Sequence, residues 1–228
     1  MEANKIKTIL LDWGHTFTGS GFSDAESEAD KLLKPYGLSW NDFYYYYSNL
    51  YILRSQGRIL TDSEMESQIK KLLGKDIPLI KIIDIIISSH IIPQENIDIV
   101  KELKKDYKVG LLSNNVKEWI EKALDNHKIS GLFDGVIVSS EVGARKPDAR
   151  IYLAALKKFS VKPEETVFVA DEIGEDLVGA KGCGLKTVWL DSGVENQWKQ
   201  SEREISEWFR PDATIKELKD VIQAIKTI

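Results

Sequence analysis

Acidic, hydroxyl and lysine side chains follow four short apolar runs of this 228-residue chain. Asp12 follows the first run, Ser113 the second and Asp171 the fourth, while Lys146 comes shortly after the third. If these runs are parallel strands, their carboxyl ends meet at one edge of the sheet, where ligands bind. Carboxylates at such an edge can attack an electrophile or bind a hard cation. The spacing therefore predicts a site that unites residues far apart in the chain.

Each of these residues also has a purely structural explanation. Asp12 or Asp171 could be a turn residue, Ser113 or Asn114 could cap the following helix, and Lys146 could be a solvated charge. Taken singly, each residue is more often structural than functional. Their occurrence in order, each after an apolar run, favours the functional interpretation.

Five apolar runs predict the strands that would position these side chains. They are residues 8–11, 107–112, 135–138, 167–170 and 187–190. None alternates with polar residues, as expected for strands buried on both faces of a parallel sheet. Helical segments follow the later runs, at residues 116–126, 149–159 and 176–182, and a last amphipathic helix is expected at 215–228. Strand alternating with helix predicts an α/β fold with a doubly wound parallel sheet.

The interval between the first two runs breaks this alternation. It contains four predicted helices, at residues 23–33, 40–54, 62–73 and 77–90. Thr61 and Glu64 have the spacing of a capping box at the start of the third. We therefore expect one α/β core formed by residues 1–18 and 93–228, with residues 19–92 as a separate all-helical cap.

The residues after the runs resemble, in order, the four motifs of the haloacid dehalogenase (HAD) superfamily. The matching residues are Asp12 with Thr16, Ser113 in GLLSNN, Lys146 with Tyr152 in VGARKPDARIY, and Asp171 with Asp176 in FVADEIGEDLVGAKG. The resemblance covers the chain from Lys5 to about Asp191 outside the predicted cap, and the last two stretches are the most specific. The insertion between the first and second motifs is similar to the family's helical cap. The resemblance implies a Rossmann-like core and a hydrolase.

The same resemblance implies a magnesium-dependent phosphohydrolase that forms an aspartyl-phosphate. The implied metal ligands are Asp12, the backbone carbonyl of Gly14 and Asp171, with Asp176 bound to the metal or next to its ligands. The implied catalytic and phosphate-binding residues are Asp12, Ser113, Asn114 and Lys146. Elementary electrostatics agrees, because adjacent carboxylates repel each other. A Mg²⁺ ion relieves that repulsion and also binds phosphate oxygens.

One position departs from the pattern of the family's phosphatases. They carry a second Asp two residues after the nucleophile as general acid and base, whereas this chain has Gly14 there and His15 next. The metal ligand at Gly14 is a backbone atom and is retained, but the proton donor is lost. Loss of a general acid costs about 10²–10⁴ in rate. We therefore expect a slow enzyme or one limited to good leaving groups, with His15 as a possible substitute donor.

Other functions stay open at this point. The family's 2-haloacid dehalogenases also lack the second Asp and share Ser113-Asn114 and Tyr152, but they work without metal and need no Asp at position 171. The presence of Asp171 favours phosphate chemistry. Phosphonate-cleaving relatives use a cap lysine, for which we find no signature. A degenerate, non-catalytic binding module is a further alternative, against which the intact motif residues argue.

The predicted cap carries an aromatic run, residues 43–47, followed by Tyr51, Arg54 and Arg58. The favoured interpretation is a buried cap core with an exposed remainder. The alternative is a pocket for an aromatic or sugar-like group, in which Arg54 or Arg58 binds an anion and His15 contacts the substrate. Because a cap closes over its site, it is expected to select the substrate.

Bulk properties narrow the classes of function. The formal net charge of −5 argues against a nucleic-acid binder. No apolar run is long enough to span a membrane, and no signal peptide is visible. The single cysteine, Cys183, fits a reducing cytosol. We expect a cytoplasmic enzyme that acts on a small phosphorylated metabolite, with no nucleic-acid or membrane partner and an oligomeric state that the sequence leaves open.

Overall fold

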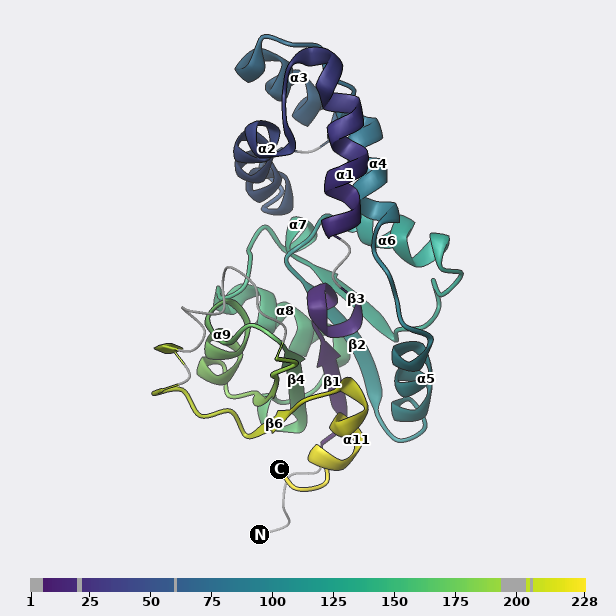
Figure 1. The fold of residues 1–228 in the computed structure, drawn as a ribbon. Coiled ribbons are helices and arrows are strands. Elements are labelled where there is room, and N and C mark those ends of the chain that lie inside the picture. The colour runs from purple at the N-terminus through teal and green to yellow at the C-terminus, as the bar shows by residue number, and fades with distance from the viewer. Residues whose placement is uncertain (1–5, 20–21, 60, 194–203, 206) are drawn as a thin grey trace.

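A computed structural model describes all residues of the chain except 1–5, 20–21, 60, 194–203 and 206 (Figure 1). The strands are β1 (Thr8–Leu11), β2 (Lys108–Ser113), β3 (Gly135–Val138), β4 (Thr166–Ala170), β5 (Lys186–Leu190) and β6 (Ala213–Ile215). They form one sheet in the order β3-β2-β1-β4-β5-β6. Every neighbouring pair is parallel, with Leu10 aligned to Gly110 on one side and Phe168 on the other. The predicted doubly wound α/β fold is confirmed.

The two ends of this sheet differ from the prediction. Strand β6 lies in a polar connection for which no strand was predicted, and much of that connection falls outside the described residues. The prediction of one continuous helix over residues 215–228 is wrong, because the helical segments there are much shorter. The chain there forms only the turn η5 (Leu218–Asp220) and the short helix α11 (Val221–Ala224).

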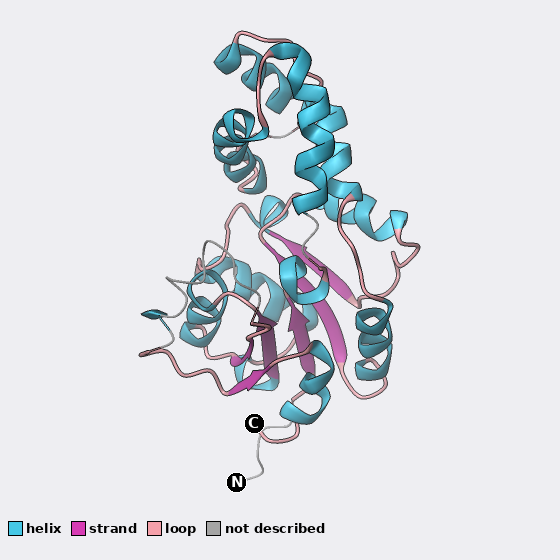
Figure 2. Ribbon diagram, in the orientation of Figure 1, coloured by secondary structure: helices cyan, strands magenta, loops and turns pink. Residues whose placement is uncertain are grey.

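Helices cover both faces of the sheet (Figure 2). The helices are α5 (Gln94–Leu103), α6 (Lys117–Asn126), α7 (Ser139–Val142), α8 (Ala149–Phe159) and α9 (Val178–Gly182). Because successive strand residues face opposite sides, Ile9 and Leu11 pack in one hydrophobic cluster with α5, α6 and α11. Leu10 packs in the other cluster, with α8 and α9. Burial on both faces explains the unbroken apolar runs of the sequence.

Four α-helices lie between β1 and α5 in the chain. They are α1 (Phe22–Leu33), α2 (Trp40–Ser55), α3 (Asp62–Leu73) and α4 (Leu79–Ser88). They contact one another and stand above the carboxyl ends of the strands (Figures 1 and 2). Their buried side chains, such as Phe43 and Met65, belong to the same continuous cluster as Ile9 and Leu11.

Local sequence signals define the ends of α2 and α3. Ser39 and Asp42 form a reciprocal capping box at the start of α2. The Thr61 hydroxyl accepts a hydrogen bond of 3.0 Å from the Glu64 amide at the start of α3, as its spacing predicted. Helix α3 ends at Gly74, whose φ of 63° is the left-handed conformation that glycine adopts at helix ends.

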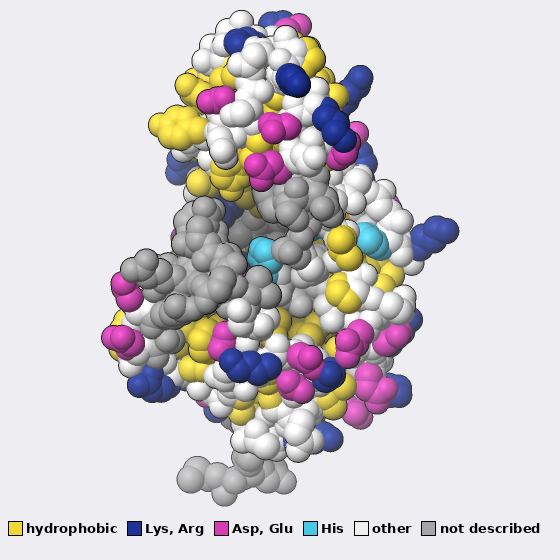
Figure 3. Space-filling view, viewed as in Figure 1, with side chains coloured by type: hydrophobic (Ala, Val, Ile, Leu, Met, Phe, Trp, Pro, Cys, Tyr) yellow, Lys and Arg dark blue, Asp and Glu magenta, His cyan; other side chains and the backbone are white. Residues whose placement is uncertain are grey.

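The visible surface mixes acidic and basic side chains without a broad patch of either sign (Figure 3). Among the described residues, no helix has both the length and the apolar character needed to cross a bilayer.

Candidate active site

Three neighbouring strands deliver the predicted residues to one edge of the sheet. Asp12 directly follows β1, Ser113 ends β2 and Asp171 directly follows β4. The loop after β3 and α7 adds Lys146, and η4 (Ile173–Leu177) adds Asp176. A cavity of about 230 Å³ opens at this edge. Its wall includes the predicted residues Asp12, Gly14, His15, Ser113, Asn114, Lys146 and Asp176.

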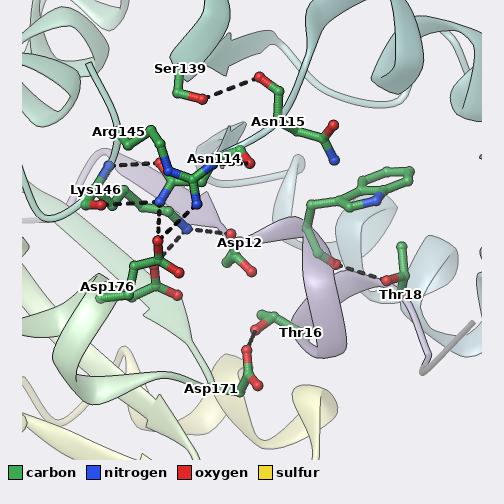
Figure 4. A network of polar contacts seen from close by, with 12 residues as sticks. Asp12, Thr16, Thr18, Asn114, Asn115, Ser139, Arg145, Lys146, Asp171 and Asp176 are labelled. Atoms are coloured by element: carbon green, nitrogen blue, oxygen red, sulfur yellow. Dashed lines mark hydrogen bonds and ion pairs between the residues drawn. The ribbon is translucent and has the colours of Figure 1, made fainter. Parts of the chain in front are cut away.

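Lys146 occupies the centre of this group (Figure 4). It is 4% exposed, and its Nζ lies 2.5 Å from Asp12 Oδ1 and 2.6 Å from Asp176 Oδ1. Burial opposes its positive charge, but the charges of Asp12 and Asp176 outweigh burial and raise the pKa of Lys146. The lysine is therefore a fixed cation beside the carboxylate of Asp12.

The side chain of Asn114 holds the backbone of Lys146. Asn114 Oδ1 accepts a hydrogen bond of 2.6 Å from the Lys146 amide, and Asn114 Nδ2 donates one of 3.1 Å to the Lys146 carbonyl. Nδ2 also donates to Glu175 Oε1 at 2.7 Å. The Asn114 side chain is thus engaged with the protein, and only its backbone amide is a candidate to bind a phosphate oxygen.

Three carboxylates gather around the lysine. Asp12, Asp171 and Asp176 each have an oxygen within 4.8 Å of the others. Burial, and then the charge of Asp12, raises the pKa of Asp171 to about 7. Burial likewise raises the pKa of Asp176 well above its usual range, although Lys146 acts against this. One lysine does not neutralise three carboxylates, and their oxygens are the ligands that a hard divalent cation prefers.

Hydrogen bonds from neighbouring side chains fix the positions of Asp171 and Asp176. Thr16 Oγ1 donates a hydrogen bond of 3.0 Å to Asp171 Oδ1, and the Trp189 indole donates one of 3.0 Å to the Asp171 carbonyl. The fully buried Tyr152 donates a hydrogen bond of 2.7 Å to the Asp176 carbonyl. Two uncharged motif residues, Thr16 and Tyr152, therefore help to position Asp171 and Asp176.

Gly14 and His15 lie in the turn η1 (Trp13–Phe17) after β1. Gly14 has φ −67° and ψ 137°, which any residue can adopt. A Cβ placed on it would have Asp12 Oδ2 as its nearest neighbour, at 3.9 Å. His15 has a φ of 49°, is exposed and lines the cavity. A side chain at position 14 would therefore start close to Asp12.

Comparison with known proteins identifies the family. A family model described as haloacid dehalogenase-like hydrolase matches residues 36–190, which is more than half of the chain. The chain belongs to this family. It is thus a member of the HAD superfamily of hydrolases, as the motifs predicted.

Relatives of this HAD hydrolase include phosphatases. The glyceraldehyde 3-phosphate phosphatase of Pyrococcus furiosus is 34% identical over 125 residues, which cover 54% of this chain and 49% of the relative. The chain thus matches about half the length of this curated relative.

Solved structures share the fold at lower identity. The HAD phosphatase from Thermococcus onnurineus superposes with a TM-score of 0.68 at 20% identity, over 97% of this chain and 99% of that one. L-2-haloacid dehalogenase from Xanthobacter autotrophicus gives a TM-score of 0.70 at 19% identity, over 98% and 99%. Because a phosphatase and a dehalogenase superpose about equally well, the fold does not distinguish between the two reactions.

The cavity wall also contains Arg145 and Glu175, which were not singled out from the sequence. Arg145 Nη1 donates to Ser55 Oγ at 2.6 Å, and Nη2 pairs with Glu175 Oε1 at 3.1 Å. The Tyr51 hydroxyl donates a hydrogen bond of 2.7 Å to the Asn114 carbonyl. Tyr51 and Ser55 are on α2, so these bonds link the inserted helices to the loops that carry the motifs. The spacing of residues in the sequence does not predict such contacts.

Two residues expected to contact substrate lie elsewhere. Arg54 is 5% exposed, and its guanidinium pairs with Asp62 at 3.2 Å and Glu118 at 3.1 Å. Arg54 links α2, α3 and α6 and is not in the cavity wall, so its observed contacts are structural. Arg58 is exposed and also lies outside the wall. Of the three substrate-contact candidates, only His15 borders the cavity.

Proposed function

We propose that this HAD hydrolase is a magnesium-dependent phosphohydrolase that acts through an aspartyl-phosphate on Asp12. The observation that carries the proposal is the cluster of Asp12, Asp171 and Asp176, with oxygens within 4.8 Å of one another. Attack on carbon needs no divalent cation. Burying Asp171 and Asp176 beside the nucleophile would then destabilise the fold without a catalytic gain. The cluster therefore favours phosphate chemistry over the dehalogenase alternative.

The residues divide the work as follows. Asp12 attacks phosphorus, and Lys146 offsets the negative charges of the nucleophile and the phosphate. Ser113 and the backbone amide of Asn114 are proposed to hold a phosphate oxygen. Asp12, Asp171 and the carbonyl of Gly14 would hold Mg²⁺, with Asp176 beside them, and the bound cation would supply charge neutralisation for the phosphoryl group.

The inserted helices are proposed as the cap of this site, formed by residues 19–92, over a core of residues 1–18 and 93–228. Support comes from their position above the strand ends (Figure 1) and from Tyr51, which lines the catalytic cavity from α2. A cap in this place excludes water and contacts the part of the substrate that leaves.

The leaving group is proposed to be a good one. Proton donation by a side chain at position 14 is impossible, because Gly14 has none. An alkoxide needs a proton in order to leave, whereas an acyl phosphate or an activated aryl phosphate needs it far less. The proposed substrate is thus a small phosphorylated metabolite with an activated phosphate.

A substrate panel with and without Mg²⁺ tests this function. Acetyl phosphate and 4-nitrophenyl phosphate should be hydrolysed only with Mg²⁺, and Asp12→Asn should abolish both activities. Dehalogenation of 2-chloropropionate without metal, unaffected by Asp171→Asn, would overturn the proposal in favour of carbon-centred hydrolysis.

A further inference from the structure

A second cavity, of about 180 Å³, adjoins the catalytic one. It lies between α2, α4 and α6, and five aromatic side chains line it: Trp13, Tyr44, Tyr47, Tyr51 and Trp119. Trp13, Tyr51, His90 and Asn115 also line the catalytic cavity. The two cavities therefore share a wall, and a group bound in the second would be next to the site of attack.

The aromatic rings in the wall of this second cavity stack on one another and so hold its shape. Tyr51 stacks on Trp119, with centroids 5.7 Å apart and planes 16° apart. It also stacks on Tyr47, at 6.1 Å and 14°. An engineered apolar cavity of about 150 Å³ is large enough to bind benzene. At about 180 Å³, this cavity has room for one aromatic ring.

The wall of the second cavity is unsuited to a charged group. Among the described residues that line it there is no Lys, Arg, Asp or Glu, and burial lowers the pKa of His90, so this ring is uncharged near neutral pH. A carboxylate or a second phosphate placed there would lose its hydration without gaining a counter-charge.

We propose that the substrate is an aryl phosphate, a monoester of an uncharged aromatic alcohol whose ring occupies the second cavity. The proposal rests on the phosphohydrolase function given above. It also accounts for Gly14, because a phenol has a pKa of about 10 and leaves as phenolate far more readily than an alkoxide. The chemistry of the leaving group and the shape of the cavity thus point to the same substrate class.

The reaction needs only water as a second reactant. An oxygen of Asp12 forms a bond to phosphorus while the bond from phosphorus to the aryl oxygen breaks, and the electron pair leaves on that oxygen. The phenolate takes a proton from solvent. Water then attacks the aspartyl-phosphate, which releases inorganic phosphate and regenerates the Asp12 carboxylate.

Binding of phosphonates tests the second cavity without turnover. In the presence of Mg²⁺, calorimetry should show phenylphosphonate binding about tenfold more tightly than methylphosphonate, since only the phenyl group fills the aromatic cavity. Tyr44→Ala removes one ring of the wall and should reduce this preference several-fold. Tyr45→Ala is the matched control, because the neighbouring Tyr45 is 68% exposed and outside the wall, and it should keep the full preference. Ser48→Trp, which fills the cavity from a half-buried wall position of α2, provides a second test should Tyr44→Ala not fold.

Turnover then separates this inference from the function on which it rests. The ratio of kcat/KM for phenyl phosphate to that for acetyl phosphate should fall in Tyr44→Ala and Ser48→Trp, and stay constant in Tyr45→Ala. Equal binding of the two phosphonates by the wild type, with Mg²⁺-dependent hydrolysis of acetyl phosphate intact, would overturn the aryl substrate alone. Hydrolysis of neither phosphate would overturn the phosphohydrolase itself.

Discussion

Replacing Gly14 by Asp should restore a proton donor to this hydrolase. The backbone at Gly14 lies in an ordinary region, with φ −67° and ψ 137°, so a side chain brings no backbone strain. The new Cβ would meet no atom closer than Asp12 Oδ2 at 3.9 Å. Because Gly14 lines the catalytic cavity, the new carboxyl group would enter that cavity, where the leaving oxygen of the substrate is expected.

The size of the effect of Gly14→Asp depends on the leaving group. A positioned general acid contributes about 10²–10⁴ in rate when the departing oxygen is a strong base. A phenolate gains little from it, so the ratio of kcat/KM for an alkyl phosphate to that for an aryl phosphate should rise about 10²-fold or more. The added carboxylate also repels Asp12, but Lys146, whose Nζ lies 2.5 Å from Asp12 Oδ1, limits that penalty.

Phosphate release from glycerol 2-phosphate and from phenyl phosphate measures this ratio. Gly14→Asn is the matched control, because it has nearly the same shape and no acid, and it should leave the ratio at the wild-type value. Calorimetry with Mg²⁺ confirms that each variant is folded and binds metal. An unchanged ratio in a folded, metal-binding Gly14→Asp protein would refute the role assigned to Gly14. His15→Gln would then show whether His15 supplies the proton.

Three further outcomes follow from buried charges. Lys146→Met leaves two buried carboxylates without their cation and should lower the free energy of unfolding in urea by about 3–5 kcal/mol at about pH 8; the loss should be smaller at about pH 5, where a carboxylate can protonate. Without metal, the pKa of Asp171 is raised to about 7. Between about pH 4 and about pH 7 the native state therefore holds a proton that the unfolded state has lost, so the free energy of unfolding falls as pH rises through that range. Mg²⁺ should therefore raise Tm more at about pH 8 than at about pH 5, and an equal rise at both would contradict the assignment of Asp171 as ligand. Arg54→Met should lower the free energy of unfolding by about 1–3 kcal/mol and leave KM for acetyl phosphate unchanged, whereas a raised KM would restore Arg54 to the substrate site.

The sequence was sufficient to predict that the motif residues lie close together at one edge of the sheet. Asp12, Ser113 and Asp171 each end or follow an unbroken apolar run, and parallel strands necessarily bring such positions to one edge. Strand β6 escaped prediction because three residues, Ala213–Ile215, carry no periodic signal. At the end of a sheet, pairing with β5 decides the conformation of so short a segment.

Contacts between the inserted helices and the core could not be predicted in the same way. Arg54 and Arg58 follow the aromatic run and were natural anion-binding candidates, yet the rotation of α2 directs Arg54 to Asp62 and Glu118. The same rotation places Tyr44 and Tyr51 in the wall of the second cavity and leaves Tyr45 exposed. The aromatic run therefore has one face that lines the second cavity and one face that is exposed.

Trapping of the covalent intermediate tests the central claim most directly. The protein is mixed with acetyl phosphate and Mg²⁺, quenched in acid over a time course and digested, and the peptide containing Asp12 is examined by mass spectrometry. We expect this peptide to carry one phosphoryl group early in turnover, because hydrolysis of the aspartyl-phosphate lacks its usual base, and we expect no such mass in Asp12→Asn. Steady release of phosphate with the Asp12 peptide unmodified throughout, or undiminished release by Asp12→Asn, would contradict the role of Asp12 as nucleophile.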